Sequence, residues 1–186
     1  MRGHTHALFG LTTLAAANAL TGLVQPHVAA GMPTGPFLCA SAAILGALAP
    51  DLDADEASIH YEMGALSDTV RVGLHLFVEH RGVLHSGLAT LIVLILGVMV
   101  GWWLGYPDAG LAFGLGYLSH VALADAMTVH GVPLFWPSSH RFHLLPAPIR
   151  VRTGGPAEAL VFLLVSLGLI WLGPNLVPVE FLKRWL

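Results

Sequence analysis

The sequence predicts an all-α integral membrane helix bundle with about five membrane helices and one amphipathic helix on the membrane surface. Of the 186 residues, 55% are hydrophobic and only 10% are charged, and the mean hydropathy is +0.74. Soluble domains carry about 25% charged residues, so this composition indicates a membrane protein. The length suits a single membrane-embedded domain that covers residues 1–186.

Five apolar segments are candidates to cross the membrane, because a spanning helix needs about 20 mainly apolar residues. They are Ala7–Val24, Phe37–Leu48, Ser86–Gly105, Leu111–Thr128 and Pro156–Leu172. The second segment is short enough to be a buried or half-spanning helix. If the five segments alternate in direction, the chain starts on one side, called side A here, and ends on the other, side B.

Both long connections then lie on side A. In Leu52–Arg81, Ser67 is a candidate N-cap, and the spacing of polar and apolar residues after it predicts a helix lying on the membrane surface. The other connection, His130–Gly155, is rich in proline and arginine.

The cations identify the side of the membrane. Side A holds six arginines, whereas side B holds only Lys183 and Arg184. The side A arginines are Arg2, Arg71, Arg81, Arg141, Arg150 and Arg152. The positive-inside rule therefore predicts an inner-membrane protein whose side A faces the cytoplasm. Trp136 fits an aromatic belt on this side, and Trp102 fits one on side B.

Composition also limits the chemistry. The net charge is −3 without a basic tract, so nucleic acid is not an expected partner. The single cysteine, Cys39, excludes a disulfide framework and a cysteine-based zinc site. Eleven histidines remain as potential ligands, because imidazole is largely neutral near neutral pH.

The predicted helix around Gly116–Thr128 carries His120 and Asp125, which cost several kcal/mol in hydrocarbon unless they pair or bind an ion. The topology brings five further candidates to the same side. These are His6, Asp51, Asp53, His80 and His85. Imidazole and carboxylate ligands suit zinc best, with manganese or iron as alternatives. Seven candidates are too many for one tetrahedral ion, so two or three divalent ions are expected.

Several motifs together resemble a known family. Thr5-His6-Ala-Leu-Phe-Gly, Pro50-Asp51-Leu-Asp53, His80-Arg-Gly-Val-Leu-His85-Ser, Gly116-Tyr-Leu-Ser-His120 with Asp125-Ala-Met-Thr128, and Gly131-Val-Pro-Leu-Phe-Trp-Pro137 with Arg141-Phe occur in this order. The set is similar to the inner-membrane, metal-dependent hydrolase family that is described as LexA-binding. That family more distantly resembles the zinc-dependent phospholipase C and P1 nuclease group, which implies a phosphoester substrate. A regulator as partner is implied by the resemblance alone.

One spacing departs from the family pattern. Four residues separate His120 from Asp125, where the family usually has three. On a regular α-helix, five steps of about 100° leave the two side chains roughly 140° apart. A π-bulge would bring them back to one face, and such bulges are common at functional sites.

The expected function is hydrolysis of a phosphoester, on a lipid or lipid-linked substrate, by a water activated at the metal ions. Asp53 is also a candidate general base, and Arg81 and Arg141 are candidates to hold the phosphate. Two other functions stay open. One is an ion or metal transporter, and the other is a non-catalytic membrane adaptor that binds a cytoplasmic regulator through Leu52–Arg81.

Overall fold

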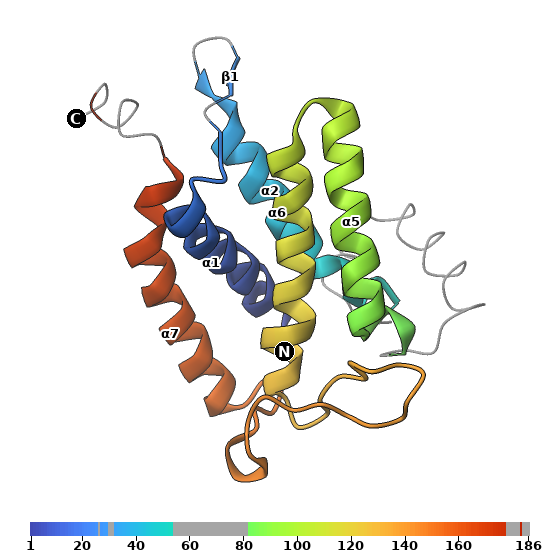
Figure 1. The fold of residues 1–186 in the computed structure, drawn as a ribbon. Helices are drawn as coiled ribbons and strands as arrows, with labels where there is room; N and C mark the ends of the chain where they lie inside the picture. Colours follow the sequence, from blue (N-terminus) through green and yellow to red (C-terminus); the bar gives the residue numbers. More distant parts are fainter. Residues whose placement is uncertain (26, 30–31, 54–81, 178–182, 184–186) are drawn as a thin grey trace.

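The computed structural model describes residues 1–25, 27–29, 32–53, 82–177 and 183. These residues form a bundle of helices, apart from one long loop and a small hairpin whose two strands have two residues each (Figure 1). The principal helices are α1 (Gly3–Thr21), α2 (Thr34–Leu48), α5 (Gly87–Leu104), α6 (Pro107–Leu118) and α7 (Pro156–Leu172). The hairpin pairs β1 (Val28–Ala29) with β2 (Met32–Pro33).

All five apolar segments form helices near their predicted positions, so the all-α prediction is confirmed. Helix α6 continues without a break into a π-helix, η3 (Ser119–Ala124), and then a 3-10 turn, η4 (Asp125–Met127). Short 3-10 turns also follow α2, as η1 (Ala49–Asp53), and precede α5, as η2 (Val83–His85). Four of the candidate polar residues lie in these short irregular segments. They are Asp51, His85, His120 and Asp125.

The helix ends follow from local chemistry. The Ser86 hydroxyl oxygen caps α5 by accepting a hydrogen bond from the backbone N–H of Ala89 at 3.0 Å. Gly105 ends α5 with φ +83°, a left-handed conformation that glycine adopts without strain. Pro107 and Pro156 begin α6 and α7, where a missing N–H costs nothing.

Helix α6 is central and packs against α1, α2 and α5, while α7 packs against α1 (Figure 1). Glycines make the close approach possible. A Cβ atom on Gly110 would collide with the carbonyl of Gly97 in α5, and one on Gly116 would collide with the carbonyl of Ala43 in α2. Small residues at membrane helix interfaces allow such backbone contact, which supplies van der Waals packing where lipid gives no hydrophobic drive. This packing fixes how far the helix ends are from one another.

Two of the described helices are long and apolar enough to cross a membrane, Gly87–Leu104 and Pro156–Leu176. The expected number of about five membrane helices therefore stays a prediction for the other three. In α5 and α7, large apolar side chains such as Leu91, Ile95, Leu163 and Ile170 are about half or more exposed, as expected for helices that face lipid. The predicted surface helix that begins at Ser67 lies outside the described residues.

The glycine contact between α5 and α6 predicts a specific sensitivity. Replacing Gly110 by valine forces the two helices apart, and we expect it to lower stability by at least about 2 kcal/mol, as overpacking typically costs 1–3 kcal/mol. Thermal unfolding of purified protein in detergent measures the effect. Gly168→Ala in α7 is the matched control, because its added Cβ would meet Thr12 Cγ2 at an ordinary 3.5 Å. Equal melting temperatures for the two variants would contradict the proposed packing.

Candidate metal centre

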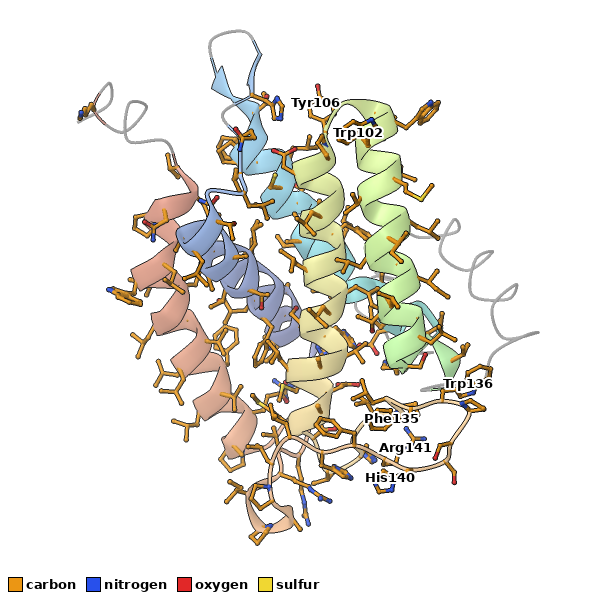
Figure 2. All side chains as sticks on the ribbon, in the orientation of Figure 1. Trp102, Tyr106, Phe135, Trp136, His140 and Arg141 are labelled. Carbon is orange, nitrogen blue, oxygen red and sulfur yellow. The ribbon has the colours of Figure 1, made fainter. Side chains whose placement is uncertain are left out.

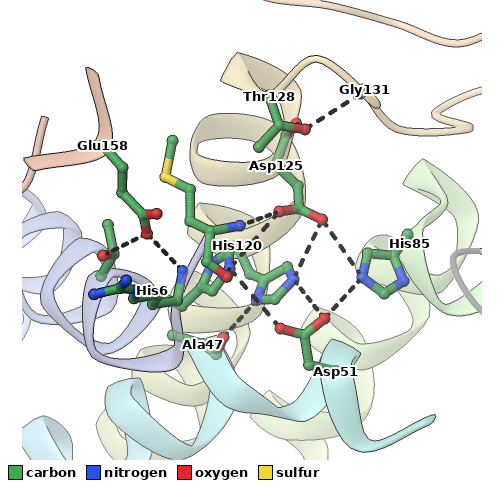
Figure 3. Close-up of polar contacts among 12 residues, drawn as sticks. His6, Ala47, Asp51, His85, His120, Asp125, Thr128, Gly131 and Glu158 are labelled. Atoms are coloured by element: carbon green, nitrogen blue, oxygen red, sulfur yellow. Dashed lines mark hydrogen bonds and ion pairs between the residues drawn. The ribbon is translucent and has the colours of Figure 1, made fainter. Parts of the chain in front are cut away.

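Five of the seven predicted ligands converge at one end of the bundle (Figure 3). His6 comes from the first turns of α1 and Asp51 from η1 at the end of α2. His85 ends η2 just before α5, while His120 lies in η3 and Asp125 in η4. Four separate stretches of chain therefore supply side chains to one place.

Four of these side chains form a ring of neighbouring ligand atoms. The Nε2 atom of His85 is 3.4 Å from Asp51 Oδ1 and 3.7 Å from Asp125 Oδ2. The Nε2 atom of His120 is 3.6 Å from Asp51 Oδ1 and 3.7 Å from Asp125 Oδ2. Two ligands held 2.0–2.1 Å from a tetrahedral zinc ion are about 3.3–3.4 Å apart, so the ring is close to the size that one ion requires.

His6 approaches the opposite side of the two carboxylates. Its Nε2 atom is 3.8 Å from Asp51 Oδ2 and 3.7 Å from Asp125 Oδ1. Each carboxylate thus directs one oxygen to the His85–His120 pair and the other to His6 (Figure 3). The Met1 carbonyl also lies 3.2 Å from His6 Nε2. Such shared carboxylates can bridge two ions.

The site is buried, and some of its polar atoms are unsatisfied. Side chains of His6, His85 and His120 are 0–1% exposed, as is Asp125, while Asp51 is 21% exposed. Within the described part of the chain, His120 Nε2 and both Asp125 carboxylate oxygens make no hydrogen bond, although the N-terminal ammonium of Met1 forms an ion pair with Asp125 Oδ1 at 3.5 Å. Leaving a buried polar group unpaired costs about 1–3 kcal/mol, and more for a charged group. A cation between these atoms would remove that cost, so the residues fit a metal ion.

The orientation of His120 is set by a partner that the sequence did not reveal. Its Nδ1 atom lies 2.6 Å from the carbonyl oxygen of Ala47 in α2. A carbonyl can only accept, so Nδ1 carries the proton and Nε2 keeps its lone pair toward the carboxylates. This is the usual outer arrangement of a metal-binding histidine.

The π-bulge that the sequence left open as one of two outcomes is present. Residues Ser119–Ala124 form a π-helix, which absorbs the extra residue between His120 and Asp125. Both side chains consequently reach the same site, with His120 Nε2 and Asp125 Oδ2 3.7 Å apart. The irregular helix therefore has a direct functional consequence, as is common for π-bulges.

Asp51 lies beyond the end of α2 and is the most accessible ligand. Burial opposes its ionisation, but the imidazole of His85, with Nε2 3.4 Å from Asp51 Oδ1, and the nearby rings of His120 and His6 hold the pKa of Asp51 well below its usual range. Asp51 is therefore a carboxylate at neutral pH, as a metal ligand must be.

The remaining predicted site residues have different outcomes. Asp53 ends η1, and only its backbone is described. His80 and Arg81 lie outside the described residues. Arg141 is exposed on the long loop after η4 and is not among the five converging side chains. His4 is also exposed, with its ring edge-on to Phe162 at 5.4 Å, so this neighbour of His6 points away from the centre.

One supporting residue escaped the sequence analysis. Glu158, at the start of α7, accepts hydrogen bonds from the Arg2 backbone N–H at 2.6 Å and the Thr5 hydroxyl at 3.0 Å. Its other oxygen accepts from the Gly154 N–H at 2.6 Å. Glu158 thereby fixes the first turn of α1, which carries His6. The only signal in the sequence was an acidic residue in the first turn of a membrane helix.

Fold and site together define a membrane-embedded helical bundle with a buried cluster of histidines and carboxylates at one end. The chain belongs to the YdjM inner membrane protein family, whose sequence model matches residues 1–177. It is 35% identical to the inner membrane protein YdjM of Escherichia coli K12 over 147 residues, 77% of this chain and 70% of that protein. It is 31% identical to the uncharacterized protein YvsG of Bacillus subtilis over 163 residues, 87% of each. No solved structure matches the chain.

These comparisons establish an inner membrane protein. They support only the inner-membrane part of the resemblance seen in the motifs. Nothing in them indicates metal-dependent hydrolysis, which also stays a prediction, nor LexA binding or kinship with phospholipase C or P1 nuclease. Those two features therefore stay predictions.

The π-helix predicts the result of a deletion. Removing Ala122 leaves three residues between His120 and Asp125, so a regular α-helix then presents both to the same face. We expect this variant to fold and to bind metal like the unaltered protein, as measured by elemental analysis. Deleting Ala112 from the regular part of α6 is the control, because it rotates the following residues by about 100° and should abolish metal binding. If the Ala122 deletion also lost its metal, the π-helix itself would be needed for metal binding.

Proposed function

We propose that this protein is a membrane-bound, metal-dependent hydrolase that acts on a phosphoester, lipid or lipid-linked, at the cytoplasmic face of the inner membrane. The observation that carries the proposal is the convergence of three buried imidazoles on two carboxylates at one end of the bundle. Buried ionisable groups in a membrane protein are costly, and they mark functional sites by default.

The arrangement supports two ions, with zinc the most suitable and manganese or iron as alternatives. One position lies among His85, His120, Asp51 Oδ1 and Asp125 Oδ2. The other lies beside His6 and the second oxygen of each carboxylate, and an ion there would have to displace the Met1 ammonium, which is 3.5 Å from Asp125 Oδ1. His6 can act as a ligand through Nε2 only when its proton is on Nδ1, so its contact with the Met1 carbonyl would then give way.

Bound divalent ions would polarise a phosphoryl oxygen and make a water nucleophilic near neutral pH. The protein side chains hold these groups in place. Asp51 is the ligand nearest to solvent, so substrate access is expected on its side of the centre. Asp53 stands two residues further along the chain and remains the candidate general base. Arg81 and Arg141 remain candidates to hold the phosphate, for which Arg141 would require a substrate that extends onto the exposed loop.

The packing beyond the centre favours a hydrolase over a transporter. A layer of small apolar side chains fills the middle of the bundle, and Leu14, Cys39, Ala43 and Ala112 in this layer are all fully buried. Asp108, the buried carboxylate toward the other end, lies on the far side of this layer, in the first turn of α6. An ion path would need polar groups through the layer. The adaptor alternative remains tied to Leu52–Arg81, outside the described residues.

The metal hypothesis predicts composition and activity together. Purified protein should carry close to two equivalents of zinc, manganese or iron. His120→Ala should lose most of both metals, because His120 belongs to both groups of neighbouring ligand atoms, one with His6 and one with His85. Hydrolysis of bis-p-nitrophenyl phosphate should fall at least about 100-fold, beyond the 10- to 100-fold typical of outer ligand partners. His6→Ala should lose about one equivalent.

His4→Gln is the matched control for His6, since it lies on the same helix and faces away from the centre. It should keep both the metal content and the activity. A protein without transition metal, and without a response to added metal, would contradict the metal centre. Metal binding without any phosphoester hydrolysis would contradict the hydrolase alone.

Topology gives an independent prediction. In a Cys39→Ala background, a single cysteine at Ser138 should be protected from a membrane-impermeant thiol reagent in intact cells, because the metal-site end is expected to face the cytoplasm. A cysteine at Asn175, near the opposite end of α7, should react. The reverse labelling pattern would place the centre on the outer face of the membrane.

A further inference from the structure

Residues 129–152, called the interfacial loop here, form an ordered structure rather than a loose connection. Val132 and Phe142 exchange two backbone hydrogen bonds of 3.0 and 2.8 Å. The N–H of Val151 donates to the carbonyl of Met127 at 2.9 Å, and both Val132 and Val151 are almost completely buried. The bundle thus holds this loop in a defined shape. The fixed shape of the loop determines which of its residues are exposed.

The tip of the interfacial loop presents two aromatic side chains. Phe135 is 64% exposed and Trp136 is 44% exposed, and every residue from 135 to 141 is exposed. Trp136 lies at the outer edge of the molecule beside the start of α5, and Phe135 lies further inward at the same end of the bundle, near Arg141 (Figure 2). Adjacent exposed aromatic residues mark interaction sites, and tryptophan in particular favours the membrane–water interface.

The level of this tip along the bundle is fixed by a contact with a membrane helix. The carbonyl of Leu134 accepts a hydrogen bond of 2.9 Å from the N–H of Gly87, the first residue of α5. Since α5 is apolar enough to span, its first residue lies near the boundary of the hydrocarbon. Phe135 and Trp136 follow Leu134 directly and therefore lie at headgroup level. Trp102 and Tyr106 occupy the corresponding place at the other end of α5 (Figure 2).

The charge of this region points to an anionic partner. Between Asp125 and Glu158 the chain has three arginines and no Asp or Glu, a net charge of +3 with histidine neutral. Arg141 and Arg152 are exposed, whereas Arg150 donates from Nε to the carbonyl of Leu145 at 3.1 Å. The cytoplasmic leaflet attracts basic segments through its anionic lipids, and aromatic residues deepen the attachment.

We propose that the interfacial loop binds anionic phospholipids of the membrane in which the protein is embedded. Phe135 and Trp136 lie among the headgroups, and Arg141 and Arg152 face the headgroup phosphates. A protein partner is less suited, because the aromatic tip already lies at the membrane boundary beside α5. The inference goes beyond hydrolysis and does not rest on it, since it requires no metal.

The test uses full-length protein with Cys39→Ala and a nitrobenzoxadiazole label on a cysteine at Ser138, reconstituted in mixed phosphatidylcholine and phosphatidylglycerol. Bromine, a short-range quencher, is placed on the acyl chains of one lipid or the other at equal mole fraction. We expect at least twofold stronger quenching by brominated phosphatidylglycerol, and the preference should fall toward unity at high salt because salt screens exposed charges. The salt measurement compares the same labelled protein with itself, so misfolding of a further variant cannot mimic the result.

Arg141→Gln with Arg152→Gln should remove the preference for phosphatidylglycerol but leave quenching by total lipid nearly unchanged. Phe135→Ser with Trp136→Ser should reduce quenching by both lipids. Lys183→Gln, a cation near the other end of the chain, should change neither. Equal quenching by the two lipids would overturn the proposal. Weak quenching by both, with energy transfer between labelled copies, would show instead that the loop binds a second copy of the chain.

Discussion

Two carboxylates shared by three buried imidazoles form the interaction on which the rest of this structure depends. Asp51 and Asp125 each turn one oxygen to His85 and His120 and the other to His6. Groups of this kind are too costly to bury separately in a membrane protein. Their convergence therefore constrains every helix that carries one, and the ends of α1, α2, α5 and α6 must meet within a few ångström.

The packing of small residues satisfies this constraint. Gly110 against Gly97 and Gly116 against Ala43 let α6 approach its two neighbours at backbone distance. The apolar layer around Leu14 and Ala112 then fills the middle of the bundle, away from the polar centre. Rigid packing around the site also holds its ligands in position, which a metal centre requires for catalysis.

The same end of the bundle is suited to work at a membrane surface. The residues of the candidate metal centre lie at the ends of helices. The interfacial loop beside them presents Phe135, Trp136 and Arg141 at the expected headgroup level. A hydrolase of a lipid-linked phosphoester would need both features, since the scissile bond of such a substrate lies at the headgroup. The proposed lipid contact would in addition keep the mouth of the centre near its substrate.

The sequence by itself determined the helical class and the five helical segments, because a long apolar stretch favours a helix. The four residues between His120 and Asp125 left two outcomes open, a π-bulge or side chains on different faces, and the structure has the π-helix. The sequence also supplied the ligand candidates, because histidine and aspartate are expensive in an apolar segment.

Only the tertiary structure decided which candidates meet. His4 and His6 differ by two positions on α1, yet one points at Phe162 and the other at the two carboxylates. The carbonyl of Ala47 orients His120 without any sequence signal, and the role of Glu158 in fixing the first turn of α1 had no signal beyond its acidic charge in a membrane helix. Distances between separate helices depend on how their surfaces interlock, and periodicity along one chain segment carries no information about that packing.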